Sequence, residues 1–182
     1  MNKLKVLMCF SVGFLTLTSC LSTKKLIEND FLPENNFRAL NGIYENIAVN
    51  TSDNPISEQS LYVLLFKMFG RQNRDEDYDG KIIIRAISDR KIQVDYIVKD
   101  EIRESQKFKG EIKNNFFVIK RKWKLLGLPP ILGFYDETKI ALGLSEDDLL
   151  YVRKGFYSVG GLIFFAAGNE EYKNWQFRKI GD

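Results

Sequence analysis

The chain has 182 residues, with 27 Lys and Arg against 24 Asp and Glu, two cysteines and no histidine. This length suits one domain with a core of its own. The lack of histidine removes the commonest general base, the commonest metal ligand and any Ser-His-Asp triad, and the nearly balanced charge argues against nucleic acid as a partner.

The first residues have the pattern of an export signal. Lys3 and Lys5 stand at the start of an apolar run over residues 4–17. That run of 14 residues is shorter than the roughly 20 residues that a transmembrane helix needs. We therefore expect residues 1–19 to be a cleaved signal peptide rather than a permanent membrane span.

The end of this segment, Leu17-Thr18-Ser19-Cys20, resembles the lipobox of bacterial lipoproteins. The resemblance implies that Cys20 receives a diacylglycerol, that the chain is cut before it, and that the new amine is acylated as well, by a fatty acid such as palmitate. Two or three acyl chains anchor a protein durably, because each buried methylene contributes about 0.8 kcal/mol. An ordinary secretory signal with an incidental cysteine is the alternative.

The same resemblance carries expectations about location. Sorting rules of Gram-negative lipoproteins imply that Leu21, in place of an aspartate after the cysteine, directs the protein to the outer membrane, where it faces the periplasm. Cys9 lies in the segment to be removed, so acylation of Cys20 leaves no thiol for a disulfide, a metal or a nucleophile. We expect a lipidated N-terminus and polar tether over residues 20–37 and a single, monomeric domain over residues 38–182.

From residue 38 onward, short runs of alternating apolar and polar residues are separated by turn signals, which is typical of an antiparallel all-β domain. The pattern predicts about ten strands, over residues 40–49, 81–88, 91–99, 106–113, 116–123, 131–135, 138–144, 149–153, 161–166 and 174–180. Asp89-Arg90 and Asn114-Asn115 predict tight hairpin turns. We expect an antiparallel meander of eight to ten strands that closes into a barrel, because closure removes exposed edges.

One segment breaks the period of two. Residues 61–69 are apolar almost all round, Asn54-Pro55 is a signal for a helix start, and Gly70 is a signal for its end. This predicts one short helix after the first strand. A buried strand is the alternative, because periodicity does not separate the two for short apolar runs.

The two ends of the domain resemble the lipocalin pattern, in which a Gly-x-Trp on the first strand packs under an arginine from the last strand. The matching residues are Gly42-Ile43-Tyr44 and Arg178, with Tyr44 in place of the Trp. The resemblance implies a lipocalin-like barrel in which Tyr44 and Arg178 close the floor by a cation–π contact worth roughly 0.5–2 kcal/mol.

Alternation also predicts which side chains face inward. Phe108, Gly110 and Ile112 fall on one face of their strand, and the charged residues Lys107, Lys109, Glu111 and Lys113 fall on the other. Extending this face to other strands gives the candidate ligand-lining residues, which are Tyr96, Phe108, Ile112, Phe116, Val118, Tyr151 and Phe164. A barrel of this size is either filled by such side chains or leaves room for one small ligand.

Residues 125–132 form an apolar stretch whose Pro129-Pro130 cannot sit inside a central strand. It is either a loop at the barrel mouth, acting as a portal or second membrane contact, or a segment buried against the helix. The acidic groups at 75–79 and 146–148 read as solvated loops, so we expect no metal and no cofactor.

These features predict a non-enzymatic, lipid-anchored barrel that binds a small apolar or amphipathic ligand in the cell envelope. The alternative is a structural or interaction lipoprotein with a solid barrel that binds another envelope protein or a glycan. An envelope enzyme comes third, since it would need two carboxylates with perturbed pKa values in one cleft.

Overall fold

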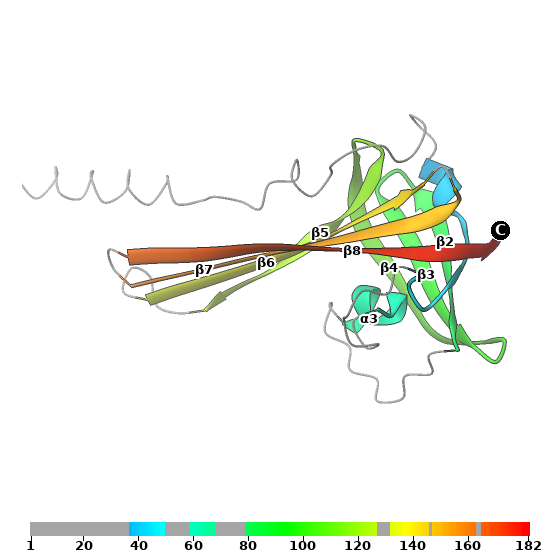
Figure 1. Ribbon diagram of the computed structural model, residues 1–182, viewed down its shortest axis with the longest axis horizontal. Coiled ribbons are helices and arrows are strands. Elements are labelled where there is room, and N and C mark those ends of the chain that lie inside the picture. Colours follow the sequence, from blue (N-terminus) through cyan, green and yellow to red (C-terminus); the bar gives the residue numbers. More distant parts are fainter. Residues whose placement is uncertain (1–36, 50–58, 68–78, 127–131, 146, 163–164) are drawn as a thin grey trace, which may run out of the picture.

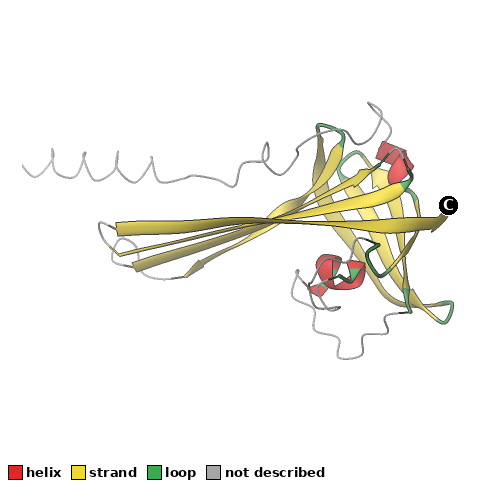
Figure 2. Ribbon diagram, in the orientation of Figure 1, coloured by secondary structure: helices red, strands yellow, loops and turns green. Residues whose placement is uncertain are grey.

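The computed structural model describes residues 37–49, 59–67, 79–126, 132–145, 147–162 and 165–182, with the side chains of 120–135 and 161–167 left out. In these residues, eight antiparallel strands follow one another in chain order and close into a barrel (Figures 1 and 2). The strands are β1 (Gly42–Glu45), β2 (Lys81–Ser88), β3 (Lys91–Val98), β4 (Glu101–Lys113), β5 (Phe116–Leu126), β6 (Leu132–Leu144), β7 (Leu149–Leu162) and β8 (Phe165–Gly181). The expected all-β meander is confirmed, and pairing of β1 with β8 completes the ring.

The strands after β4 are longer and fewer than the sequence predicts. The two predicted strands at 131–135 and 138–144 are one strand, β6, and β7 and β8 each run through segments that we expected to be turns. Asp136 and Glu137 interrupt the apolar pattern of β6, yet both hold their places in the ladder opposite Ser158 and Tyr157. The ladder is made by backbone groups, so polar side chains do not by themselves end a strand.

The hairpin turns explain how the meander reverses so tightly. Asn114 and Asn115 have φ of 44° and 67°, and Lys99 and Asp100 have φ of 51° and 63°. Two consecutive residues with positive φ are the geometry of a type I′ turn, whose twist matches that of the flanking strands. Asn-Asn signals this turn in the sequence, whereas Lys-Asp does not, which is why only the first was predicted.

Two short helices meet the barrel. The 3-10 helix η1 (Phe37–Leu40) leads into β1, and the helix α3 (Leu61–Leu65) confirms the predicted helix. The Ser60 hydroxyl caps α3 by accepting from the Val63 amide. The Asn46 amide oxygen accepts from the Tyr62 amide at 2.9 Å and from the Ser60 hydroxyl at 3.0 Å, which ties α3 to the chain after β1.

Beyond the barrel, β5–β8 continue as a long sheet that projects away from α3 (Figure 1). The β6–β7 ladder runs from Leu144 opposite Leu150 to Leu132 opposite Leu162, and the β7–β8 ladder ends at Leu162 opposite Phe165. We call this projecting part the arm.

Several expectations from the sequence concern residues outside the described ranges. The signal segment, Cys20, the tether up to residue 36, Asn54-Pro55 and residues 127–131 lie outside the described residues. Among the described helices, none has the length and apolar character needed to cross a bilayer.

Candidate functional site

The barrel interior is occupied by α3 together with inward side chains of the strands. The Tyr62 ring lies 4.3 Å from the Tyr96 ring between centroids, and the Phe66 ring lies 6.1 Å from the Phe108 ring, edge to face. Tyr96 and Phe108 thus face inward as predicted, and both belong to the main buried core. Their neighbours there are aromatic rings of the α3 segment.

The packing of this core leaves little room beside its members. Many inward side chains have an accessible fraction of 0%, among them Ile82, Ile92, Val94, Phe117, Leu142 and Phe177. A side chain with no accessible surface touches neither bulk solvent nor an internal void that could hold a water molecule. Around these side chains the barrel is therefore filled.

The atoms around Gly110 are packed as closely. A Cβ at this position would lie 2.5 Å from the Val118 carbonyl oxygen and 2.6 Å from the Phe117 ring. A side chain at 110 would therefore collide with the backbone and with a core ring. Gly110 faces inward as predicted, but no open space lies beside it.

The predicted inward face is wrong for Phe116 and Val118. In the β4–β5 ladder, Gly110 is opposite Ile119 and Ile112 is opposite Phe117, and paired residues share a face. Phe117 and Ile119 accordingly belong to the main core, whereas Phe116 and Val118 lie on the outer face. The segment Phe116–Ile119 is apolar throughout, so alternation could not fix its phase.

Two further members of the predicted lining set also lie elsewhere. Ile112 shares the inward face by register, but at the end of β4 its accessible fraction is 45%, so it is not part of the buried core. Tyr151 is half-buried on the outer face, with its ring 6.4 Å from that of Phe116. Phe164 lies outside the described residues.

The predicted Tyr44–Arg178 contact is also wrong, although the strands that carry the two residues do pair. Tyr44 is opposite Lys179, which places Arg178 on the other face of β8. Tyr44 is fully buried and donates a hydrogen bond of 3.0 Å to the Leu40 carbonyl. Arg178 is exposed on the outside, 3.7 Å from the Glu45 carboxylate. Barrel closure therefore depends on the β1–β8 ladder and not on a ring-cation stack.

The outer face of β5–β8 next to the barrel carries a small mixed cluster. We define this outer cluster as Phe116, Val118, Ala141, Tyr151, Arg153 and Tyr172. The Arg153 guanidinium lies 5.2 Å from the centre of the Tyr172 ring, and the Tyr172 hydroxyl donates to Glu170. Burial raises the pKa of Tyr151, more strongly than the Arg153 charge lowers it.

Arg153 and Tyr172 were not predicted as site residues. They come together only because β7 pairs with β8 in a register that puts Gly155 opposite Tyr172 and Arg153 opposite Asn174. Residues 167–173 were not predicted as a strand, so the predicted strands could not place Tyr172 beside Arg153. An ion pair of 3.1 Å between Lys139 and the buried Glu137 lies on the same sheet.

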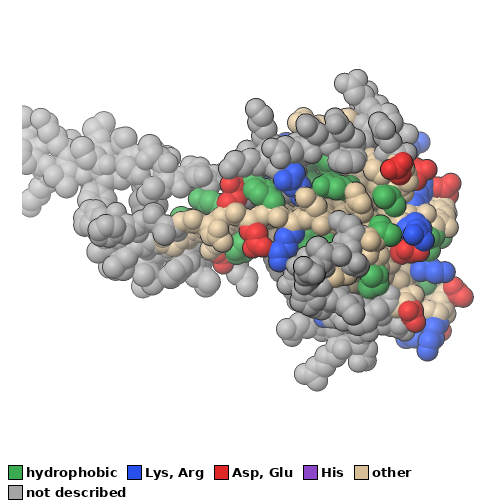
Figure 3. All heavy atoms as spheres, viewed as in Figure 1, with side chains coloured by type: hydrophobic (Ala, Val, Ile, Leu, Met, Phe, Trp, Pro, Cys, Tyr) green, Lys and Arg blue, Asp and Glu red, His purple; other side chains and the backbone are tan. Residues whose placement is uncertain are grey.

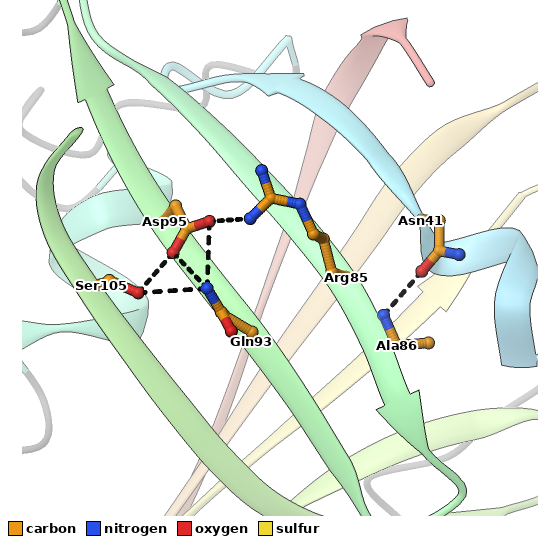
Figure 4. Close-up of polar contacts among 6 residues, drawn as sticks. All are labelled: Asn41, Arg85, Ala86, Gln93, Asp95 and Ser105. Atoms are coloured by element: carbon orange, nitrogen blue, oxygen red, sulfur yellow. Dashed lines mark hydrogen bonds and ion pairs between the residues drawn. The ribbon is translucent and has the colours of Figure 1, made fainter. Parts of the chain in front are cut away.

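A second polar cluster lies on the outer face of β2–β4 (Figure 4). Arg85, Gln93 and Ser105, from three neighbouring strands, all donate to the Asp95 carboxylate, which has no accessible surface. Burial alone would raise the pKa of Asp95, but the hydrogen bonds from Ser105 and Gln93 and the Arg85 charge outweigh it and hold the pKa below its usual value. These donors come from β2, β3 and β4, so the cluster ties three strands together.

The described residues contain no group of three potential metal-ligating side chains. Asp79, Asp147 and Asp148 from the two acidic stretches are exposed, and residues 75–78 and 146 lie outside the described part. Acidic and basic side chains are interspersed on the barrel face seen in Figure 3. No family model, no curated protein and no solved structure matches this chain.

Proposed function

We propose that this chain is an acylated envelope protein, held through Cys20 on the outer membrane and facing the periplasm, whose solid barrel is a non-enzymatic module that binds another envelope protein. The observation that carries the choice of a solid barrel is the set of inward side chains with an accessible fraction of 0%. A site for a small apolar ligand needs a cavity of roughly 300–1,000 Å³. The contacts between α3 and the strands favour a filled interior over such a cavity.

The outer cluster is the surface on which we place the partner. Tyr and Arg are the residue types that most often dominate the binding energy of protein interfaces, and apolar neighbours exclude water around them. Tyr151 and Tyr172 are half-buried beside the fully packed Phe116 and Ala141, and Arg153 is already oriented over one of the two rings. Such a preorganised surface loses little side-chain entropy on binding.

Site-specific photocrosslinking in the native host tests this function. A photoreactive residue at Tyr151 is expected to give a discrete crosslinked protein, and the additional change Arg153→Ala is expected to remove it. A photoreactive residue at Lys107, exposed on the outside of β4, is the matched control and should give no such product. Equal crosslinking from both positions would contradict a specific surface.

Native mass spectrometry of the purified protein tests the solid interior separately. The expected mass is that of the acylated chain alone. A small molecule that copurifies in stoichiometric amount, and that is lost when the barrel unfolds, would contradict the proposal and favour a ligand-binding barrel instead.

A further inference from the structure

The end of the arm joins two apolar segments that are distant in the sequence. Residues 125–135 and 159–168 carry no charged side chain. The ladders bring their strand residues together in four successive rows. From the barrel outward, these rows are Leu125–Tyr135–Val159–Gly168, Leu126–Phe134–Gly160–Ala167, Gly133–Gly161–Ala166 and Leu132–Leu162–Phe165.

The change from polar to apolar along the arm is abrupt. The row just before the four apolar rows is Lys124–Asp136–Ser158–Asn169, and the one before that is Trp123–Glu137–Tyr157–Glu170. An antiparallel sheet with one face in water alternates apolar and polar residues. The four end rows do not alternate, so both faces of the sheet are suited to an apolar environment.

No described strand of the barrel's other half reaches these rows. β4 pairs with β5 only as far as Ile119, and β1 pairs with β8 only at Lys179 and Gly181. From Phe165 to Gly181 is 16 residue steps, or on the order of 50 Å at about 3.4 Å per residue. The barrel core therefore lies too far away to cover the apolar end.

The residues at the polar boundary indicate what the end of the arm contacts. Trp123 and Tyr157 share the row before the boundary row, and Tyr135 is in the first apolar row. Trp and Tyr concentrate where a protein passes from hydrocarbon to the headgroup level of a bilayer. The rows at this boundary carry charges of both signs, with Lys124 on β5, Asp136 and Glu137 on β6 and Glu170 on β8, so they belong in the polar headgroup region and not in hydrocarbon.

We propose that the apolar end of the arm inserts into one leaflet of a lipid bilayer, with Trp123, Tyr135 and Tyr157 at the level of the headgroups. The four rows span roughly 10 Å, which fits within one leaflet of a hydrocarbon core about 30 Å thick. A deeper position is disfavoured, because the edges of an open sheet carry backbone groups that hydrocarbon cannot satisfy. This contact is independent of acylation at Cys20 and would give the protein a second attachment to a membrane.

Depth-dependent quenching of tryptophan tests the insertion, since Trp123 and Trp175 are the only two tryptophans in the chain. The full-length protein is reconstituted into vesicles of phosphatidylethanolamine and phosphatidylglycerol with brominated acyl chains. In the Trp175→Phe variant, Trp123 is expected to lose more than about half of its emission, as a residue at the interface would. In the Trp123→Phe variant, the buried Trp175 is expected to keep its emission.

A matched pair of substitutions on β8 tests the boundary. Ala167 and Asn169 are two residues apart on one face, in an apolar row and in the polar boundary row respectively. Ala167→Asp is expected to abolish quenching of Trp123, because a carboxylate in hydrocarbon shifts insertion by at least about tenfold. Asn169→Asp is expected to leave it unchanged. Phe165→Asp, at the end of the same strand, is a second test, and thermal unfolding shows that each variant keeps its fold.

Three outcomes would overturn the proposal. The first is that the emission of Trp123 is not quenched, and the second is that Trp123 and Trp175 are quenched equally. The third is that Ala167→Asp and Asn169→Asp have equal effects on the quenching of Trp123. Analytical ultracentrifugation of the detergent-free protein adds a fourth. Self-association that Ala167→Asp abolishes, together with unquenched Trp123, would assign the apolar end to contact with a second copy of this chain.

Discussion

The hydroxyl of Tyr62, on α3, donates a 3.0 Å hydrogen bond to the Glu104 carboxylate on the inner face of β4. The same ring packs, tilted, against the ring of Tyr96 on β3, so one side chain joins the helix to two strands. This contact holds α3 against the inner face of β3 and β4.

Tyr62→Phe is expected to lower the free energy of unfolding by about 1.5–3 kcal/mol, the range for a hydrogen bond to a charged group. A double-mutant cycle with Glu104→Gln should give a coupling energy above about 0.5 kcal/mol. Additive losses in denaturant unfolding would mean that the two side chains do not interact in solution.

The same pair predicts a dependence on alkaline pH. Burial, followed by the hydrogen bond to Glu104 and its charge, raises the pKa of Tyr62 to about 12 from 10.0. A raised pKa means that the folded state holds the phenol proton more tightly, so this contribution is complete below pH 10.0 and is lost as pH rises toward about 12. The stability advantage of the parent over Tyr62→Phe should shrink across that window. A difference in unfolding free energy between the parent and Tyr62→Phe that stays constant across that window would contradict this prediction.

Asp95→Asn is expected to destabilise the fold by about 1–3 kcal/mol, because Arg85 loses its negative partner and an amide donor replaces one of the two acceptor oxygens. Glu101→Gln is the control, since its ion pair with Arg103 is exposed on both sides and exposed pairs contribute at most about 1 kcal/mol.

The lowered pKa of Asp95 also predicts how stability depends on pH in the acid range. Its contribution is present above the usual pKa of 3.8 and is lost as pH falls below it. Chemical denaturation of the parent and Asp95→Asn at acid and neutral pH should therefore converge toward low pH.

Gly110→Ala is expected to cost about 1–3 kcal/mol, the usual penalty of overpacking a filled core. Gly181→Ala is the matched control, because a Cβ there would lie at an ordinary 3.4 Å from Ile43. Thermal melts of the two variants test this, and equal melting temperatures would contradict the close contacts around Gly110.

Cys20→Ser is expected to abolish incorporation of radiolabelled palmitate and to leave the arm as the remaining membrane contact. The membrane contact made by the arm persists in the Cys20→Ser variant. It is lost in the double variant that combines Cys20→Ser with Ala167→Asp. Label retained on the Cys20→Ser protein would rule out acylation at this residue.

Local signals in the sequence were enough for β2, β3 and the greater part of β4 and β5, for the turns at Asp89-Arg90 and Asn114-Asn115, and for the helix at residue 61. Alternation and turn chemistry act over a few residues, and a closed meander follows when many short connections occur in succession. They were also enough to place Tyr96 and Phe108 inside the barrel, because polar residues alternate with apolar ones on both β3 and β4.

Tertiary pairing alone decided the rest. Phe116–Ile119 has no polar residue to set its phase, and a shift of one residue sends every side chain to the opposite face, so the β4–β5 register had to place Phe117 inside and Phe116 outside. Arg178 was separated from Tyr44 in the same way, by the register of β8 on β1. The apolar end of the arm forms because the β6–β7 and β7–β8 ladders hold residues 132–135 beside 159–168, a proximity that depends on the continuous pairing of whole strands and that no local pattern contains.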